Sequence, residues 1–204
     1  MIVCLVTDRR RADPVMQARL GAEVGIDLIQ VRERDLGAAA LATIVTRVLE
    51  AVRGTRTRVV VNDRLDVAIA CGAHGVHLRS DSIPVLAARS LAPRRFLIGR
   101  SVHVVGEASR AATGADYLIA GTVFATSSKP DVTPLLGIDG LRAVVHAVTV
   151  PVLAIGGVTT GRLDAIAGAG AGGIAGIGLF TTPEGLASVT GSVRIRFDSV
   201  KTAS

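Results

Sequence analysis

The sequence predicts a (β/α)8 barrel, and three observations support this fold class. Short β-branched runs alternate eight times with Ala-, Leu- and Arg-rich stretches, glycines separate many of these stretches from the next apolar run, and the chain has 204 residues. Eight βα units in about 200 residues is the lower size limit of this barrel. The alternative, an open doubly wound sheet, usually has a glycine-rich first turn, whereas Asp8-Arg9-Arg10 follows the first run here. The closed barrel is therefore favoured.

Each expected strand is apolar on both faces, as parallel strands covered by helices must be. In chain order the strands are expected at 2–7, 28–31, 58–61, 75–78, 96–99, 117–120, 152–155 and 173–177. The stretches between them have the composition of helices, which are expected at 13–22, 37–53, 65–72, 84–91, 105–113, 139–147 and 160–168, with an eighth from about 183. No linker or composition break divides the chain, so residues 1–204 are expected to form one domain.

A weak internal repeat supports these boundaries. Gly-Ala pairs occur where a helix should end and the next strand begin, at Gly21, Gly72, Gly114 and Gly170. Glycine suits this place because it readily adopts a positive φ at a helix C-terminus.

Composition excludes several classes of protein. A chain that is 49% hydrophobic is not disordered, and no uncharged apolar run approaches the 18 residues of a membrane-spanning helix. No signal-peptide pattern opens the chain, so a cytoplasmic location without a membrane partner is expected. The net charge of +6 is spread along the chain and only 2% of residues are aromatic, which argues against a nucleic-acid partner. Cys4 and Cys71 lie in apolar segments and are expected to be buried thiols.

The active site of such a barrel lies at the C-terminal ends of its strands. After the second strand, Gln30, Arg32 and Arg34 alternate along one side and could converge on this mouth. Neighbouring guanidiniums repel each other unless they bind an anion, so phosphate or carboxylate recognition is expected. The alternative is that Glu33 and Asp35 pair with neighbouring arginines on a solvated rim.

Glycines predict a phosphate site after the last two strands. Gly156-Gly157 and Gly176-Ile177-Gly178 stand where barrels of this class often bind phosphate through backbone N–H groups. The longest connection, 121–138, is a candidate active-site loop, and it contains Lys129, one of only two lysines in the chain.

Among the histidines, His103 is the best candidate for proton transfer, because it follows the fifth strand beside Ser101. His77 could be a core imidazole or a ligand contact, and no histidine spacing indicates zinc. Asn62 and Asp63 could orient a substrate amine or hold Mg²⁺, but Asp63 could equally cap the helix that starts near residue 65.

Several segments, taken in order, resemble one known superfamily. They are 29–34 (IQVRER), 61–64 (VNDR), 75–78 (GVHL), 98–103 (IGRSVH), 116–117 with 121–129 (GTVFATSSK), and 151–157. The chain resembles the thiamine phosphate synthase/TenI superfamily over essentially its whole length, which implies a TIM barrel acting on a thiazole phosphate in thiamine biosynthesis.

The resemblance implies two enzymatic activities. Synthases join a pyrimidine pyrophosphate to a thiazole phosphate with Mg²⁺, whereas TenI-type proteins are thiazole tautomerases that aromatise a carboxythiazole phosphate. This chain departs from the synthase pattern at Arg34, where synthases have Lys, and at Ser82, where they have an acidic metal ligand, although Asp81 stands one residue away. The Arg-Glu-Arg and Gly-Arg-Ser-Val-His segments look like the TenI branch.

The leading expectation is therefore a thiazole tautomerase that needs no cofactor and takes a small phosphorylated thiazole as its partner. In this interpretation His103 is the general acid/base, and the substrate phosphate is held by Gly156, Gly157, Ile177 and Gly178. The carboxylate and ring are bound by Gln30, Arg32, Arg34 and Lys129, and Thr126 is a further substrate-binding residue.

Two alternatives stay open. The first is a thiamine-phosphate synthase with Mg²⁺ at Asp63, in which pyrophosphate meets Arg32, Asn62, Ser101 and Lys129. The second is a non-catalytic sensor of thiamine intermediates. A homo-oligomer is compatible with either.

Overall fold

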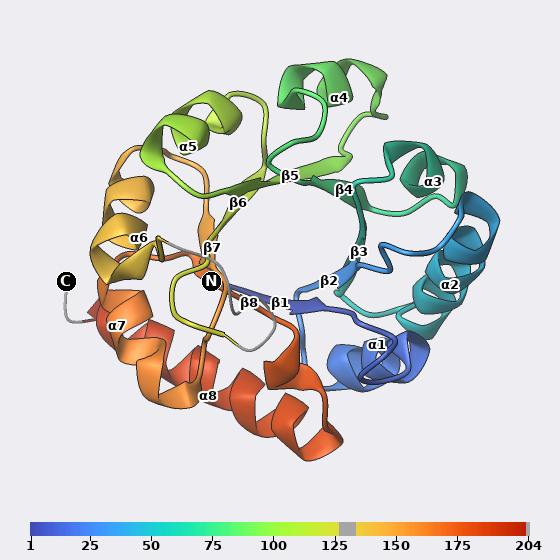
Figure 1. Ribbon diagram of the computed structural model, residues 1–204. Coiled ribbons are helices and arrows are strands. Elements are labelled where there is room, and N and C mark those ends of the chain that lie inside the picture. Colours follow the sequence, from blue (N-terminus) through green and yellow to red (C-terminus); the bar gives the residue numbers. More distant parts are fainter. Residues whose placement is uncertain (127–133, 203–204) are drawn as a thin grey trace.

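The computed structural model describes residues 1–126 and 134–202, and its core is a closed ring of eight parallel strands in the order β1 to β8 (Figure 1). The strands are β1 (Ile2–Val6), β2 (Leu28–Val31), β3 (Arg58–Asn62), β4 (Gly75–Leu78), β5 (Leu97–Val102), β6 (Tyr117–Ala120), β7 (Val152–Ala154) and β8 (Gly173–Gly176). The ring closes because β1 pairs with β8, with Ile2 opposite Gly173. The predicted (β/α)8 barrel is confirmed.

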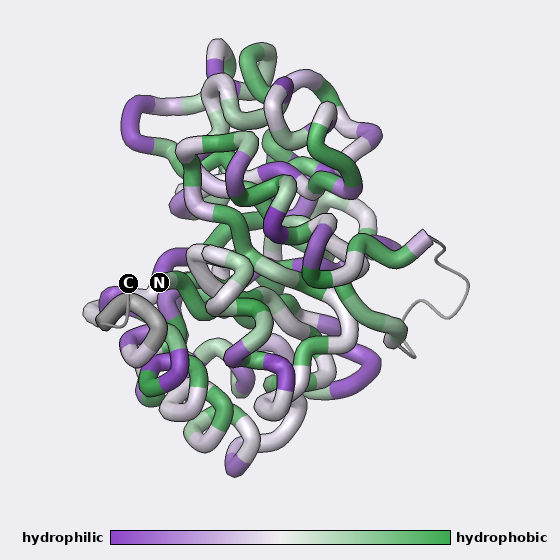
Figure 2. Tube along the Cα trace, turned by 90° about the vertical axis from the view of Figure 1, so that its left-hand side faces the viewer, coloured by the Kyte–Doolittle hydropathy of each residue, from purple (hydrophilic) through white to green (hydrophobic). Residues whose placement is uncertain are grey.

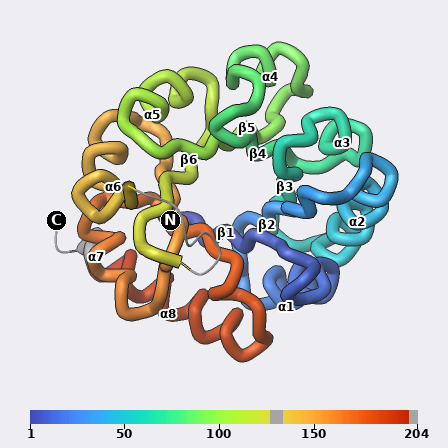
Figure 3. The backbone as a smooth tube through the Cα atoms, viewed as in Figure 1, coloured from blue at the N-terminus to red at the C-terminus, as the bar shows by residue number. Residues whose placement is uncertain are grey.

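Helices follow the strands and form an outer ring, as the smooth trace shows (Figure 3). They are α1 (Pro14–Glu23), α2 (Ala38–Ala51), α3 (Leu65–Ala70), α4 (Val85–Leu91), α5 (Val105–Ala112), α6 (Gly137–His146), α7 (Leu163–Gly168) and α8 (Pro183–Thr202). Short 3₁₀ turns, η1 (Thr160–Arg162) and η2 (Gly178–Phe180), precede α7 and α8. Within the described residues no helix combines the length and hydropathy needed to span a bilayer.

The strand alternation divides the apolar side chains into two layers. One set points into the barrel and forms a small inner cluster: Cys4, Val6, Leu28, Val60, Tyr117, Ile119, Leu153 and Ala175. The other set packs against the helices in the main core, for example Leu5, Ile29 and Val61. Strands that are buried on both faces explain the near-continuous apolar runs of the sequence. In side view, hydrophilic residues occupy many of the outer turns (Figure 2).

Several boundaries differ from the predicted ones. The largest difference is at β5, which continues to Val102 instead of ending at residue 99, because Arg100 and Ser101 pair with Leu118 and Ile119 of β6. Residues 160–162 form a 3₁₀ turn and not the start of an α-helix. Cys4 is buried as expected, whereas Cys71 is only half-buried.

Glycines end helices at three of the four predicted places, Gly72, Gly114 and Gly170, whereas Gly21 lies inside α1 and Gly25, with a φ of +82°, follows that helix. Gly72 and Gly170 have φ angles of +67° and +81°, which residues with a Cβ adopt at a cost. These two glycines turn the chain from α3 and α7 into the strands that follow.

Candidate active site

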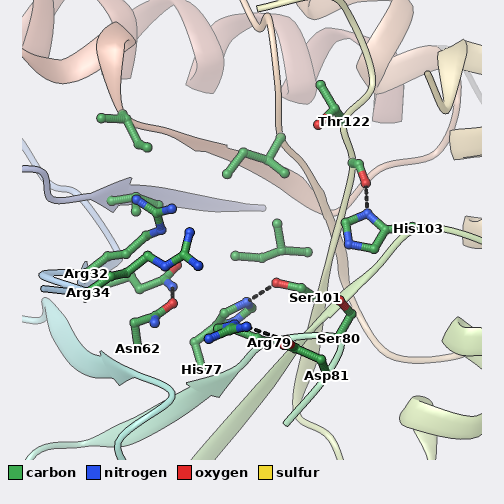
Figure 4. A pocket seen from close by; sticks show the side chains of 16 residues that line it. Arg32, Arg34, Asn62, His77, Arg79, Ser80, Asp81, Ser101, His103 and Thr122 are labelled. Carbon is green, nitrogen blue, oxygen red and sulfur yellow. Dashed lines mark hydrogen bonds and ion pairs between the residues drawn. The ribbon is translucent and has the colours of Figure 1, made fainter. Parts of the chain in front are cut away.

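A cavity of about 350 Å³ lies at the mouth formed by the C-terminal ends of the strands (Figure 4). It brings together most of the predicted site residues: Gln30, Arg32, Arg34, Asn62, Ser101, His103 and Ile177. Its wall also contains residues outside the predicted set: Val6, His77, Arg79, Ser80, Asp81, Ile119, Gly121, Thr122 and Ile155.

Strand register explains why the polar side chains meet. Asn62 of β3 stands opposite His77 of β4, and Val60, two residues before Asn62, belongs to the inner cluster. Because side chains two residues apart share a face, Asn62 points into the barrel above that apolar layer. The same alternation places Gln30 above Leu28 and Ser101 two residues after Gly99. A polar layer therefore lies on an apolar floor.

Gln30 and Asn62 form a pair of amides on the cavity wall. Gln30 Nε2 donates to Asn62 Oδ1 over 2.8 Å, and the Gln30 residue is 3% exposed. With those two atoms engaged, the pair offers the Gln30 oxygen as an acceptor and the Asn62 amide nitrogen as a donor. This donor–acceptor set suits a planar heterocycle that carries an amine.

Arg32 and Arg34 lie side by side on one wall, across the cavity from His103 and Thr122 (Figure 4). In the part of the chain that the structure describes, neither guanidinium makes an ion pair. Burial, followed by the charge of Arg34, lowers the pKa of Arg32 from its ordinary value. Two guanidiniums that face a cavity without an ion-pair partner among the described residues have the charge and the donors to bind an anion.

The two nearby carboxylates, Glu33 and Asp35, bind other residues of the protein and not Arg32 or Arg34. Glu33 is 4% exposed and accepts from the Thr7 hydroxyl (2.6 Å) and from the Arg9 backbone N–H (3.1 Å). Thr7 in turn accepts from the Arg32 backbone N–H over 3.0 Å. Asp35 forms a bidentate pair with Arg9, over 2.6 and 2.9 Å. Glu33 and Asp35 therefore engage Arg9, which leaves Arg32 and Arg34 available.

Asp63 does not cap α3, so that interpretation is wrong. The N-cap position is Arg64, which makes no side-chain cap bond, and the Asp63 carboxylate points instead to the residues after β4. It contacts the Ser82 hydroxyl and lies 3.7 Å from the Arg79 guanidinium. The other guanidinium nitrogen of Arg79 pairs with Asp81. Two carboxylates thus approach one arginine; Arg79 and Asp81 line the cavity, whereas Asp63 is not among the lining residues.

His77 is a buried imidazole with both ring nitrogens engaged. Its Nδ1 lies 3.2 Å from the Tyr117 hydroxyl and its Nε2 lies 2.9 Å from the Ser101 hydroxyl. Burial, followed by the charge of Arg100, lowers the pKa of His77 from 6.5 to about 3. His77 is therefore neutral at physiological pH, and it is both a core residue and part of the cavity wall.

His103 is exposed and lies at the far side of the cavity from the arginines. Its Nδ1 contacts the carbonyl oxygen of Gly121, and its backbone N–H donates to Glu107 over 2.7 Å. These contacts hold the ring against the start of the β6–α6 connection, beside Thr122.

The predicted phosphate glycines are only partly at the cavity. Ile177 lines it, whereas Gly156, Gly157 and Gly178 follow or flank lining residues without lining it themselves. Gly156 and Gly157 have φ angles of +98° and +61°, and a Cβ on either would collide with residues 122–125. Close packing against the β6–α6 connection therefore requires these two glycines, independently of any ligand.

The last two predicted site residues, Thr126 and Lys129, belong to the segment between β6 and α6. Thr126 is half-buried at the end of the described part of the β6–α6 connection and is not among the residues that line the cavity. Lys129 lies outside the described residues.

Arg79 and Thr122 line the cavity although no role was predicted for them, and Asp81, one residue from the acidic position of the synthase pattern, lines it as well. Arg79 follows β4 directly, whereas Asp81 and Thr122 stand three residues after β4 and two residues after β6, so all three lie in segments that follow strand ends. The sequence does not show that the Arg79 side chain extends to Asp63, which follows β3. Among described residues, no group of three acidic, histidine or cysteine side chains converges as a ready metal site.

The family model described as thiamine monophosphate synthase matches residues 3–180. The chain belongs to the thiamine monophosphate synthase family. It is 44% identical over 185 residues to the thiamine-phosphate synthase of Methanoregula boonei, covering 90% of this chain and 86% of that one. It is 40% identical over 185 residues to the enzyme of the same name from Methanoculleus marisnigri, with 90% and 88% covered.

A solved structure supports this family, and another shows the same fold. The thiamine phosphate pyrophosphorylase from Pyrococcus furiosus superposes with a TM-score of 0.86 at 33% identity, covering 98% of this chain and 96% of that one. A 3-hexulose-6-phosphate synthase superposes with a TM-score of 0.73 at 19% identity, covering 96% and 99%, a likeness of fold alone.

These relatives correct the expectation of a thiazole tautomerase, since family members at 40–44% identity are named thiamine-phosphate synthases. They also support an enzyme and not a sensor. The physical reason for the error is that one residue in each of the two segments taken as TenI-like binds other parts of the protein. Glu33 is bound by Thr7 and Arg9, and Arg100 donates to the carbonyl oxygens of Ile83 and Ser80 over 2.6 and 2.9 Å. Neither role depends on which reaction the cavity performs.

Proposed function

We propose that this enzyme is a thiamine-phosphate synthase, a transferase that joins hydroxymethylpyrimidine pyrophosphate to thiazole phosphate. In this reaction the bond between the pyrimidine methylene carbon and the pyrophosphate oxygen breaks, and the thiazole nitrogen forms a new bond to that carbon. Inorganic pyrophosphate leaves. The observation that carries the proposal is the uncompensated pair Arg32 and Arg34 on the cavity wall.

Pyrophosphate binding follows from charge. The leaving group is a polyanion, and its departure is easier where positive charge and donors already surround it. Arg32 and Arg34 supply the charge, and the Ser101 hydroxyl faces the same cavity. Lys129, the only lysine of the long β6–α6 connection, is proposed as a further cation for this anion.

The amide pair supports recognition of the pyrimidine. The ring of the substrate carries an amine donor next to a ring-nitrogen acceptor, which complements the free oxygen of Gln30 and the free amide N–H of Asn62. Since Gln30 Nε2 and Asn62 Oδ1 already bind each other, the free acceptor of Gln30 and the free donor of Asn62 are fixed relative to each other. A fixed acceptor and donor orient the ring and hence the methylene carbon.

Magnesium fits the two carboxylates beside Arg79. Mg²⁺ is commonly held by one or two carboxylates together with substrate phosphates, not by a complete protein cage. Asp63 and Asp81 meet across Arg79, and the Ser82 hydroxyl contacts Asp63, so oxygen donors from two strand ends lie together. Asp63 and Asp81 would hold the ion, which when bound neutralises charge on the leaving pyrophosphate.

The thiazole phosphate is proposed to bind at the opposite side of the mouth. Ile155 and Ile177 line the cavity, and the glycine segments 156–157 and 178 continue directly from them. Backbone N–H groups of such segments suit a phosphate. Thr122 and His103 line the cavity, and Thr126 follows Thr122 in the same connection. All three are proposed as substrate contacts, because forming the carbon–nitrogen bond requires no proton transfer by His103.

The test is coupling of the two substrates by purified protein. Incubation with hydroxymethylpyrimidine pyrophosphate, thiazole phosphate and Mg²⁺ should give thiamine phosphate and pyrophosphate in equal amounts, quantified by liquid chromatography and mass spectrometry. Asp63→Asn should lower kcat/KM by at least about a hundredfold. Asp164→Asn, which removes a carboxylate from a surface pair with Arg196, is the matched control and should behave as wild type. No thiamine phosphate under any Mg²⁺ concentration would overturn the proposal.

A further inference from the structure

His77 connects the barrel core with the cavity through two hydroxyl groups. Tyr117 contacts one ring nitrogen and Ser101 the other, so the three side chains form the chain Tyr117–His77–Ser101. Tyr117 is 3% exposed and belongs to the inner apolar cluster, whereas Ser101 lines the cavity (Figure 4). A group inside the core is thereby linked to one that faces the substrates.

The meeting of Tyr117 and His77 depends on Gly99. In the barrel register Gly99 of β5 stands opposite His77 of β4 on one side and Tyr117 of β6 on the other. A Cβ at Gly99 would collide with the Tyr117 ring and with His77 Nδ1. Without it, the two rings approach to 5.6 Å between centroids across the middle strand.

The buried phenol determines the direction of the first hydrogen bond. Burial raises the pKa of Tyr117 well above its ordinary value, so the group stays a phenol with one O–H hydrogen to place. His77 Nδ1 is the partner of its oxygen among the residues described. If Nδ1 carried a hydrogen, the buried phenolic hydrogen would lack an acceptor, which costs about 1–3 kcal/mol. Tyr117 therefore donates and Nδ1 accepts.

The second hydrogen bond follows from the first. A neutral imidazole whose Nδ1 accepts must carry its hydrogen on Nε2. The Nε2–H group then donates to Ser101 Oγ over 2.9 Å. Because that oxygen is already accepting, the hydrogen of the Ser101 hydroxyl is free to point into the cavity. With the opposite tautomer Ser101 would donate to His77 and would present only lone pairs to an anion.

We propose that Tyr117 is a positioning residue that holds His77 in its Nε2–H tautomer and thereby makes Ser101 a hydrogen-bond donor to an anion in the cavity. The identity of that anion as pyrophosphate rests on the proposed function, whereas the tautomer does not. Tyr117 touches no substrate itself. Its influence passes through the imidazole.

The tautomer can be measured directly in the substrate-free protein. Long-range ¹H–¹⁵N correlation spectra of the imidazole at neutral pH should show His77 with its hydrogen on Nε2. In Tyr117→Phe, which removes only the hydroxyl, the Nδ1–H form should become populated. His77 carrying its hydrogen on Nδ1 in the wild type would overturn the proposal without reference to any activity.

Binding of inorganic pyrophosphate with Mg²⁺, followed by calorimetry, tests the consequence for the cavity. We expect Ser101→Ala and Tyr117→Phe each to weaken binding by about five- to twentyfold, and the double variant to be no worse than Ser101→Ala alone. Phe180→Leu truncates a fully buried ring of the outer core and controls for loss of packing, so its affinity should equal that of the wild type. Additive losses in the double variant would contradict the link through His77.

The two proposals fail in different ways. A wild-type protein with the Nε2–H tautomer that neither binds pyrophosphate nor forms thiamine phosphate would contradict the proposed function. A synthase in which Tyr117→Phe changes neither tautomer nor affinity would contradict the positioning role alone.

Discussion

Arg79 at the end of the β4 strand holds its Nη1 3.7 Å from Oδ2 of Asp63 at the end of β3. Its Nη2 pairs with Asp81, so one guanidinium stands between the two carboxylates that would bind Mg²⁺. A resident cation and an incoming divalent ion compete for the same oxygens. Arg79 should therefore raise the concentration of Mg²⁺ that the enzyme needs.

Replacing Arg79 with Gln should strengthen divalent-ion binding. With the competing charge removed, the dissociation constant for Mn²⁺, read from the loss of its free electron paramagnetic resonance signal in substrate-free protein, should fall about two- to fivefold, as expected for a partly exposed ion pair. Arg142→Gln, which breaks the surface pair with Asp139 on α6, should leave the constant unchanged. Weaker Mn²⁺ binding in Arg79→Gln would mean that Arg79 supports the ion and does not compete with it.

Arg32→Met should separate stability from function. Burial and the neighbouring Arg34 disfavour the charge on Arg32, so replacing the guanidinium with an apolar chain should raise the free energy of unfolding by about 0.5–1 kcal/mol. The same change should lower kcat/KM at least about a hundredfold, because the leaving pyrophosphate loses a donor. Urea unfolding and initial rates measure the two effects. Arg47→Met, on the exposed part of α2, should change neither, and a destabilised Arg32→Met would show that the guanidinium has a structural partner.

Glu33→Gln should reduce stability, because it weakens a buried charge-assisted network. The Thr7 hydroxyl and the Arg9 N–H both donate to this carboxylate, and the expected loss is about 1–3 kcal/mol in the free energy of unfolding. Asp35→Asn is the matched control: it removes an exposed carboxylate bound by the same arginine and should have a much smaller effect. Equal losses in urea denaturation would show that burial of Glu33 is not the cause.

Acid should destabilise the protein partly through His77. Its folded-state pKa of about 3 lies below the ordinary 6.5, so between these values the unfolded chain binds a proton that the folded chain does not. The stabilising contribution is complete above pH 6.5 and is lost as the pH falls towards 3, by up to about 1.4 kcal/mol per pH unit. His74, whose pKa is also lowered by burial and then by Arg58, acts in the same direction.

Unfolding curves from pH 7 to pH 4 test this dependence. His77→Gln should show a shallower loss of stability over that range than the wild type, even if its stability at pH 7 is lower. His146→Gln, which removes an exposed imidazole at the end of α6, should keep the wild-type slope. Parallel slopes for His77→Gln and the wild type would exclude His77 as the source.

The fold could be predicted because its signals are local. Each strand is a short apolar run, and the glycines that follow α3 and α7 mark the turn into the next strand. The error at β5 has a physical reason: Arg100 and Ser101 are polar and looked like loop, but their backbones pair with β6 while one side chain reaches loop carbonyls and the other the cavity. The change from apolar to polar side chains therefore does not coincide with the end of this strand.

The site could be predicted only as far as strand ends define it. Gln30, Asn62 and Ser101 were found because period-two alternation places them at the mouth. The pairing of Glu33 with Thr7 and Arg9 joins residues 24 and 26 positions apart, which no spacing rule indicates. The expected branch of the family is wrong because Arg34, Ser82 and the Arg-Glu-Arg and Gly-Arg-Ser-Val-His segments were taken to favour the TenI branch. Glu33 and Arg100, within those segments, bind other parts of the protein and do not distinguish the two reactions.

Tyr117 belongs to the apolar interior of the barrel and is also linked through His77 to Ser101, which lines the cavity. Most interior positions can drift among residues of similar volume, since only packing constrains them. A phenylalanine at position 117 would fill the same volume, but it would offer no hydroxyl to the imidazole of His77. If Tyr117 were replaced by phenylalanine during divergence of this family, the affinity for anions would change although no residue that contacts an anion had changed.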